Sequence, residues 1–204
     1  MLRIEDVANH RDFRPLGTVP GVEVDLRYAS EDNFAGRVLY TCDGVLWDCA
    51  WLRREAADGL AAAAAWLERH RPGWRIRVLD ALRPQRVQEA IWRDVVGTPL
   101  QPYFANPEVG SIHSFGMAVD VTLVQPNGAE ADMGSGFDEM SERSHPEFHE
   151  RLLAEGVLAP AQIDERRWLA DAMAAGGFAG IATEWWHFDH GDRVRVRRDW
   201  PRVI

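Results

Sequence analysis

The sequence predicts an α+β fold, in which a central, mainly antiparallel sheet carries helices packed on it in a single domain. Its 204 residues, 46% of them hydrophobic and 10% aromatic, are enough for one domain with a substantial core. Segments with the period of strands occur beside segments with strong helix propensity. They do not alternate regularly as β-α-β units, and this argues against a doubly wound parallel sheet.

The first half of the chain predicts two strands and two helices. Residues 22–29 alternate apolar and polar side chains, which indicates a half-buried strand. An alanine-rich block over 52–70 predicts a helix, and the alternating residues 74–80 predict a second strand. Pro84 suits the first turn of another helix that ends near residue 96. The proline-rich stretch 97–110 is expected to be a loop.

The second half begins with a β-branched strand over 118–124. Pro146 and Pro160 each mark the expected first turn of a helix. The aromatic and β-branched residues 178–189 predict a last strand or a pair of strands. Residues 193–198 alternate valine and arginine, so we expect an edge strand or an exposed tail.

Composition excludes several classes of protein. The chain has 23 basic and 32 acidic residues, a net charge of −9, and all its basic residues are arginine. This balance argues against a nucleic-acid-binding surface and against attachment to anionic lipid. No apolar run approaches the ~20 residues of a membrane span, and the N-terminus becomes acidic before any apolar run. We therefore expect a cytoplasmic protein.

The two cysteines, Cys42 and Cys49, are too few for a disulfide framework or a four-cysteine metal site. We assign them no function and expect buried or unreactive thiols. A metal site in this chain must therefore use nitrogen and oxygen ligands, which its seven histidines and many carboxylates supply.

The most informative segment runs from Gly110 to Val121. His113 lies in a loop bounded by glycine and serine, and Asp120 lies inside the following β-branched strand. A carboxylate there is costly unless a partner or a metal compensates its charge. If the loop folds back, His113 and Asp120 supply one nitrogen and one oxygen to a cation. The alternative is a buried aspartate that accepts hydrogen bonds from the histidine and the loop backbone.

A second segment places Glu184 and His187 among aromatic residues. Exclusion of water raises the pKa of a carboxylate toward the range of a general base. In a flat strand the two side chains point to opposite faces, so the strand must begin, bulge or turn between them. The alternative is a core strand with a glutamate at its rim and a hydrogen-bonded histidine.

Together the two segments offer three ligands, His113, Asp120 and His187, with a fourth position open for water. This arrangement is typical of catalytic rather than structural zinc. Glu184 is then available as a base beside that water.

Arg83 follows the strand 74–80, where an arginine could stabilise a developing oxyanion; the alternative is a surface ion pair with Asp80. A weaker candidate metal pair, His145 and His149, has the i, i+4 spacing of a helix face. However, Pro146 occupies the place where helical zinc motifs carry the glutamate base, so we expect a solvated helix start. The remaining histidines, predicted to be surface residues, are His10, His70 and His190.

These segments resemble the D-alanyl-D-alanine dipeptidases, a zinc dipeptidase family that includes the vancomycin-resistance dipeptidases. The resemblance extends from about Val24 to Phe188, and the motifs follow the order of the family. They are Asp25-Leu26-Arg27-Tyr28-Ala29 with Asp32-Asn33-Phe34, Asp80-Ala81-Leu82-Arg83-Pro84, Ser111 to Asp120, Met133 to Asp138, and Glu184-Trp185-Trp186-His187. The chain departs from the family at Phe115, where arginine is common, and at Phe188, where tyrosine is common.

The resemblance implies that residues 1–204 form one zinc dipeptidase domain with an antiparallel α+β fold. It implies one zinc ion per chain and a small dipeptide, D-alanyl-D-alanine, as substrate. The implied roles are zinc binding by His113, Asp120 and His187, general-base catalysis by Glu184, transition-state stabilisation by Arg83, binding of the substrate's carboxylate by Ser111, and binding of its ammonium by Asp138 with Tyr28.

Two other functions stay open at this point. A zinc D,D- or L,D-carboxypeptidase acting on cell-wall peptides is disfavoured by the lack of an export signal. A zinc-stabilised binding domain without catalysis is disfavoured because it needs neither Glu184 nor Arg83. The sequence leaves open whether the role is antibiotic resistance or recycling of cell-wall dipeptides, and it leaves the oligomeric state undefined.

Overall fold

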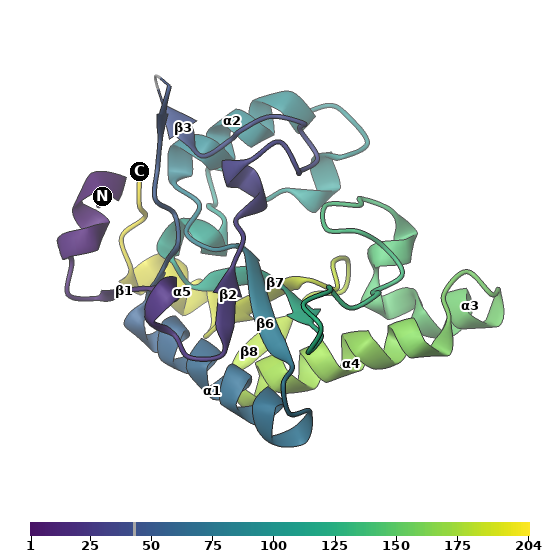
Figure 1. Cartoon of the computed structure of the whole chain (residues 1–204). Helices are drawn as coiled ribbons and strands as arrows, with labels where there is room; N and C mark the ends of the chain where they lie inside the picture. Colours follow the sequence, from purple (N-terminus) through teal and green to yellow (C-terminus); the bar gives the residue numbers. More distant parts are fainter. Residues whose placement is uncertain (43) are drawn as a thin grey trace.

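The computed structural model describes residues 1–42 and 44–204 (Figure 1), and of Cys42 only the backbone is described. A five-stranded sheet forms the centre, and two short two-stranded sheets lie outside it. The central strands are β2 (Val22–Val24), β6 (Arg75–Asp80), β7 (Ala118–Val124), β8 (Phe178–Gly180) and β9 (His187–His190). The outer pairs are β1 (Phe13–Pro15) with β5 (Trp51–Arg53), and β3 (Thr41–Cys42) with β4 (Val45–Leu46). The helices are α1 (Arg54–His70), α2 (Gln85–Val95), α3 (His149–Ala154), α4 (Pro160–Ala175) and α5 (Arg193–Asp199).

The order of strands in the central sheet is β2-β6-β7-β9-β8. The β2–β6 pair is parallel, and the other three pairs are antiparallel. In Figure 1, α1 and α4 lie along the lower side of this sheet, and α2 lies at the upper side. The predicted α+β class with a mainly antiparallel sheet is therefore confirmed.

The main hydrophobic core lies between the sheet and the pair α1–α4. The alanine block forms α1, and its buried residues recur every three or four positions, from Ala56 to Leu67. Small side chains let α1 approach α4 closely: a Cβ at Gly59 would lie 2.4 Å from the carbonyl oxygen of Gly176. Every residue of β7 is buried, because helices cover one of its faces and the candidate site described below covers the other.

Several predicted elements change in the structure. The strand expected over 22–29 stops at Val24, and a 3-10 helix over Arg27–Ala29 turns Tyr28 into the core. The expectation of a strand or tail over 193–198 is wrong, because this segment is α5. Asp192 caps that helix by accepting a hydrogen bond from the Arg195 N–H at 2.8 Å.

Other elements agree more closely with expectation. The prediction of a strand at 118–124 matches β7, and the segment 178–189 is the antiparallel pair β8–β9. Pro84 lies just before α2 rather than in its first turn, whereas Pro160 is the first residue of α4. The stretch 97–110 contains a short 3-10 helix, Gln101–Tyr103.

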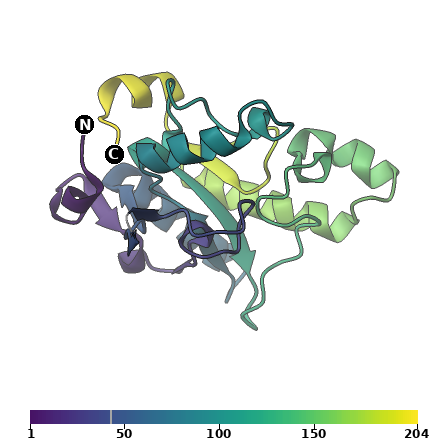
Figure 2. The same ribbon diagram turned by 90° about the horizontal axis from the view of Figure 1, so that it is seen from above.

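The two termini lie side by side, as Figure 2 shows from above. The Leu2 N–H donates to the carbonyl of Arg202 at 3.0 Å, and Leu2 pairs with Val203 in an isolated bridge. The last residues of the chain are thus built into the same body as the first. Within the described part of the chain, every helix is too short or too polar to cross a lipid bilayer.

Candidate active site

Three neighbouring strands bring their functional side chains into one row. Asp80 on β6 pairs with Asp120 on β7, and Asp120 pairs with His187 on β9. The register of β6 shifts between Val78 and Asp80, and this irregularity places Asp80 opposite Asp120. A row across the three inner strands of the sheet therefore carries two carboxylates and an imidazole.

His113 reaches this row because the chain folds back before β7. It lies in a 3-10 helix, Ile112–Phe115, which ends at Gly116 with φ +70°. Gly116 suits this left-handed turn, where a Cβ would also come within 2.9 Å of the Phe13 ring. Nε2 of His113 lies 3.3 Å from Oδ1 of Asp120, so the expected meeting of the loop with the strand occurs.

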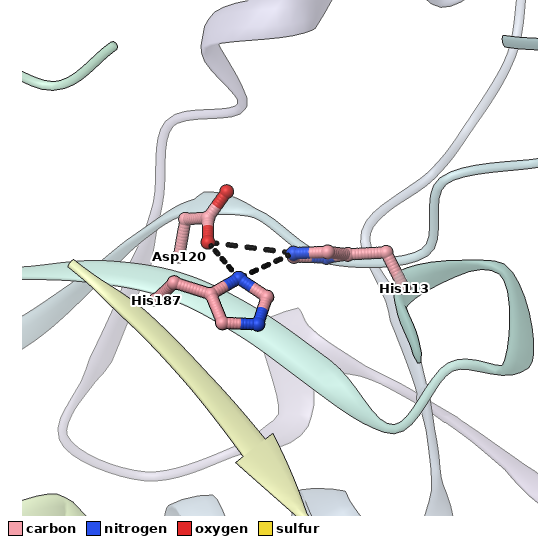
Figure 3. Close-up of side chains that lie close together, drawn as sticks. All are labelled: His113, Asp120 and His187. Atoms are coloured by element: carbon pink, nitrogen blue, oxygen red, sulfur yellow. Dashed lines mark hydrogen bonds and ion pairs between the residues drawn. The ribbon is translucent and has the colours of Figure 1, made fainter. Parts of the chain in front are cut away.

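The three predicted ligands point toward one another (Figure 3). One ligand atom from each of His113, Asp120 and His187 lies within 4.8 Å of the other two. Nδ1 of His187 is 2.9 Å from Oδ1 of Asp120 and 3.1 Å from Nε2 of His113. His113 and Asp120 are buried, and His187 is partly buried.

Hydrogen bonds on the far side of each ring define which nitrogen faces the centre. Nδ1 of His113 lies 2.8 Å from the carbonyl of Ala81, which can only accept, so this nitrogen carries the proton. Nε2 of His187 lies 3.0 Å from Oδ1 of Asp189 and carries the proton in the same way. In the neutral rings, two nitrogen lone pairs and a carboxylate oxygen therefore converge on one point. Such a set fits a divalent cation with nitrogen and oxygen ligands.

The pKa shifts within the cluster also favour a bound cation. Although burial opposes it, His113 and His187 hold the pKa of Asp120 far below its usual range. Burial alone would lower the pKa of His187, but Asp189 and Asp120 raise it well above its ordinary value. Without a cation, the acidic groups around His187 thus favour a second proton on its ring. The cluster attracts positive charge, either as a metal ion or as a proton.

Asp189 is a residue that the sequence prediction missed. It follows His187 by two positions in β9, so both side chains lie on the same face of the strand. Arg193 forms an ion pair with Asp189 from the start of α5. Although burial opposes it, His187 and Arg193 together lower the pKa of Asp189. The His-x-Asp spacing in an aromatic strand was the available signal for this carboxylate, which orients a candidate ligand.

Glu184 lies just before β9, and the strand begins only after it, as the prediction for Glu184 and His187 required. Residues 185 and 186 form a turn and the strand begins at His187, so Glu184 and His187 are not held on opposite faces of one strand. The Glu184 carboxylate is buried, and burial raises its pKa to about 7, against the opposing influence of His187. A carboxylate of this pKa accepts and returns protons near neutrality.

Arg83 is held rigidly beside the cluster. Its Nε donates to Oδ2 of Asp80 at 2.9 Å, and its Nη1 donates to Oε1 of Gln88 at 3.0 Å. Nη2 lies 3.6 Å from Oδ2 of Asp120. The Asp80 pair exists, but both partners are buried, so the alternative of a surface ion pair is wrong. Gln88, on the buried face of α2, is another residue that the sequence analysis did not identify.

Asp138 and Tyr28 meet beside Arg83, whose guanidinium carbon lies 5.0 Å from the centre of the Tyr28 ring. The Tyr28 hydroxyl donates to Oδ1 of Asp138 at 3.3 Å, and the Phe34 N–H donates to Oδ2 at 3.2 Å. Asp138 has φ +59°, a left-handed conformation that aspartate tolerates better than most residues. Burial and the nearby charge of Asp120 raise its pKa well above the usual value, so a cationic group beside it would stabilise its ionised form.

All eight predicted site residues line one pocket of about 290 Å³. Its volume suits a small ligand. Ser111 contributes to the wall just before the 3-10 helix that carries His113. The eight residues are Tyr28, Arg83, Ser111, His113, Asp120, Asp138, Glu184 and His187.

The weaker candidate pair does not form a second cluster. Nε2 of His145 is 3.1 Å from the Tyr103 hydroxyl, whereas Nε2 of His149 is 3.1 Å from Nη1 of Arg166. The two rings thus have different partners. His145 is buried and His149 is partly buried, so the expectation of a solvated helix start is wrong for both.

The three histidines predicted to be surface residues differ in their exposure to solvent. His70 is exposed and His10 is partly exposed, but His190 packs its ring edge-on against Phe178 and is also only partly exposed. Cys49 is buried and free, and burial raises the pKa of its thiol. The expectation for the Cys42 thiol lies outside the described residues.

Comparison with known proteins places this site in a family. The peptidase M15 family model, described as D-Ala-D-Ala dipeptidase, matches residues 12–204. The chain is 37% identical over 170 residues to a D-alanyl-D-alanine dipeptidase of Escherichia coli K12, covering 83% of this chain and 79% of that protein. It is 31% identical over 191 residues to a dipeptidase of the same name from Streptomyces coelicolor, covering 83% and 86%.

A solved structure described as the LdcB LD-carboxypeptidase is 18% identical, with a TM-score of 0.48, and covers 93% of this chain and 74% of that one. The fold, the convergent ligand set and the family match together define the class of the protein, which is a metallopeptidase. Within that class, the chain belongs to the D-Ala-D-Ala dipeptidase family.

Proposed function

We propose that the protein hydrolyses D-alanyl-D-alanine to free D-alanine with one zinc ion held by His113, Asp120 and His187. The observation that carries the proposal is the gathering of the ligand set, Glu184 and Arg83 in one small pocket, in a chain of the D-Ala-D-Ala dipeptidase family. The chemistry that a bound zinc ion supplies is polarisation of the scissile carbonyl and acidification of a water molecule.

Glu184 is the proposed general base. Its carboxylate accepts the proton of the attacking water and delivers that proton to the leaving amine. Burial of Glu184 supports this role, since it brings the pKa to about 7, where both transfers have little thermodynamic cost.

Arg83 is the proposed stabiliser of the negative charge that develops on the carbonyl oxygen. Its guanidinium is held in place by Asp80 and Gln88 before the substrate arrives, so little reorganisation is needed during the reaction. Burial alone would lower the pKa of Arg83, but Asp80 and the other acidic groups around it raise that pKa above its ordinary value, so Arg83 keeps its charge throughout.

The two ends of the substrate have separate proposed partners. Asp138, with Tyr28, binds the free ammonium, and Ser111 binds the carboxylate. An N-acylated peptide has no ammonium and would leave the Asp138 carboxylate without a cation, at a cost of roughly 2–5 kcal/mol. The proposal therefore predicts that the protein prefers dipeptides to chains extended at the N-terminus. We further propose that residues 1–204 act as one domain in the cytoplasm, with the dipeptide as a small-molecule partner.

The test measures zinc content and hydrolysis of D-Ala-D-Ala and its N-acetyl derivative by the purified protein. We expect about one zinc per chain and cleavage of the free dipeptide alone. Cleavage of only the acetylated peptide would show a carboxypeptidase and would overturn the role of Asp138. Tight zinc binding without turnover of either would indicate a binding domain. Full activity of a zinc-loaded Glu184→Ala variant would refute the mechanism.

A further inference from the structure

The wall of the pocket contains two arginines that the proposed mechanism does not use. These arginines are Arg193 and Arg197, which both belong to α5. Asp138 lines the same pocket but comes from another part of the chain. In a chain of net charge −9, arginines at a pocket wall need an explanation. One of the two already has a charged partner, because Arg193 pairs with Asp189.

Arg197 lacks such a charged partner. Its Nε and Nη2 donate to the carbonyl of Gly110 at 3.2 and 3.1 Å, and this hydrogen-bonded carbonyl immediately precedes Ser111. In the part of the chain that the structure describes, no ion pair joins Arg197 to a carboxylate, and its Nη1 has no hydrogen bond. Burial and the charge of Arg193 lower its pKa, so an anion at this position would stabilise its charged form.

We propose that Arg197 binds the C-terminal carboxylate of the dipeptide together with Ser111 and so determines that the substrate must end in a free acid. A serine hydroxyl donates one hydrogen bond and no charge, whereas a guanidinium supplies charge and a fork of donors that matches a carboxylate. The contact with Gly110 holds the Arg197 side chain next to Ser111. This inference rests on the proposed dipeptidase function.

The charges of the pocket then orient a zwitterion in one direction. The ammonium faces Asp138 and the carboxylate faces Arg197, with the peptide bond between them beside Glu184 and Arg83. A dipeptide spans at most about 7 Å, so both charged ends contact the pocket at once only if no further residue is attached. Arg197 therefore restricts the C-terminal end as Asp138 restricts the N-terminal end.

The experiment compares D-Ala-D-Ala with its C-terminal amide, D-Ala-D-alaninamide, on the zinc-loaded protein. The amide serves as a substrate or, where it is not cleaved, as a competitive inhibitor. For Arg197→Gln we expect kcat/KM for the free acid to fall about 100-fold, mainly through KM, because a carboxylate loses its charged partner. Cleavage or binding of the amide should change less than about threefold, within the range of a surface substitution. Arg195→Gln, an exposed change on the same helix, should leave both unchanged.

An equal loss on acid and amide, or no loss on either, would overturn the role of Arg197 while leaving the dipeptidase function intact. Failure of the wild-type protein to cleave D-Ala-D-Ala would instead refute the proposed function, and the inference with it. If Arg197→Gln does not fold, the variant Arg197→Lys tests the role of Arg197 instead. It keeps the charge and loses the fork, so the acid-to-amide ratio should fall several-fold, and an unchanged ratio counts against the inference.

Discussion

Nε2 of His113 lies 3.1 Å from Nδ1 of His187, and each ring has its proton engaged on the opposite side, by Ala81 and Asp189. Two lone pairs in such proximity repel unless a cation or a proton lies between them. The pair therefore links metal binding to pH, since zinc and a proton compete for the same position on His187.

Zinc affinity should rise with pH, by about tenfold per unit between pH 6 and 8, because binding displaces one proton from His187. The pKa of His187 is raised in the folded, metal-free protein. Its contribution to metal-free stability is therefore present below the unfolded pKa of about 6.5 and lost as pH rises through the folded value. Competition with a chelator at several pH values measures the affinity. An affinity independent of pH in this range would contradict the raised pKa of His187 in the metal-free protein.

Glu184→Gln should reduce kcat by a factor of about 10² to 10⁴, because the amide cannot accept a proton. Zinc content should stay near the wild-type value, since Glu184 is not one of the three convergent ligands. Metal analysis and steady-state kinetics on the same preparation separate loss of the base from loss of the metal. A comparable loss of zinc would mean that Glu184 acts through the metal site instead.

The same substitution should stabilise the metal-free protein at high pH. The folded pKa of Glu184, about 7, lies above the unfolded value of 4.5, so the folded state binds more protons between them. Wild-type stability from this group is present at low pH and lost between about pH 4.5 and 7. Urea unfolding of both proteins should show the advantage of Glu184→Gln growing by about 2–3 kcal/mol from pH 5 to 8. A constant difference would show that the Glu184 pKa is not raised.

Asp189→Asn should weaken zinc binding by about 10- to 100-fold, because His187 loses the carboxylate that holds its ring and tautomer. At saturating zinc, activity should largely recover. Asp199→Asn, an exposed change near the end of α5, is the matched control and should bind zinc normally. Zinc titration of the wild-type protein and both variants measures the affinity. An unchanged affinity in Asp189→Asn would leave this carboxylate with a structural role only.

Asp138→Asn should lower kcat/KM for D-Ala-D-Ala about 100-fold, because the substrate ammonium loses its anionic partner. The ratio of free to N-acetylated dipeptide should fall by a similar factor. Asparagine tolerates the left-handed backbone at this position, so the fold should persist. Kinetics with both substrates provide the measurement, and an unchanged ratio would remove Asp138 from ammonium recognition.

Local pattern was enough to anticipate the fold class and five residues that meet in the pocket, namely Arg83, His113, Asp120, Glu184 and His187. The period of two over 118–124 predicts β7 and separates Asp120 from the valines of the core face. The position of a carboxylate inside that strand indicates a compensating partner, whatever the rest of the fold. The family motifs led to the same five residues and added Tyr28, Ser111 and Asp138, and all eight line the pocket.

Relationships between distant segments depended on the packed chain. The register shift after Val78 and the contact of Arg197 with the Gly110 carbonyl join parts of the chain that carry no local sign of one another. The sequence pattern also does not show the turn between Glu184 and His187 or the ion pair of Arg193 with Asp189, although these residues are close along the chain. Residues 193–198 alternate like a strand but form α5, because Asp192 caps a helix and only Val196 of the two valines is buried. Strand periodicity indicates which side chains share a face, but pairing register and helix docking follow from the burial of the whole chain. That tertiary burial brings Arg197 to the carbonyl of Gly110, the residue before Ser111.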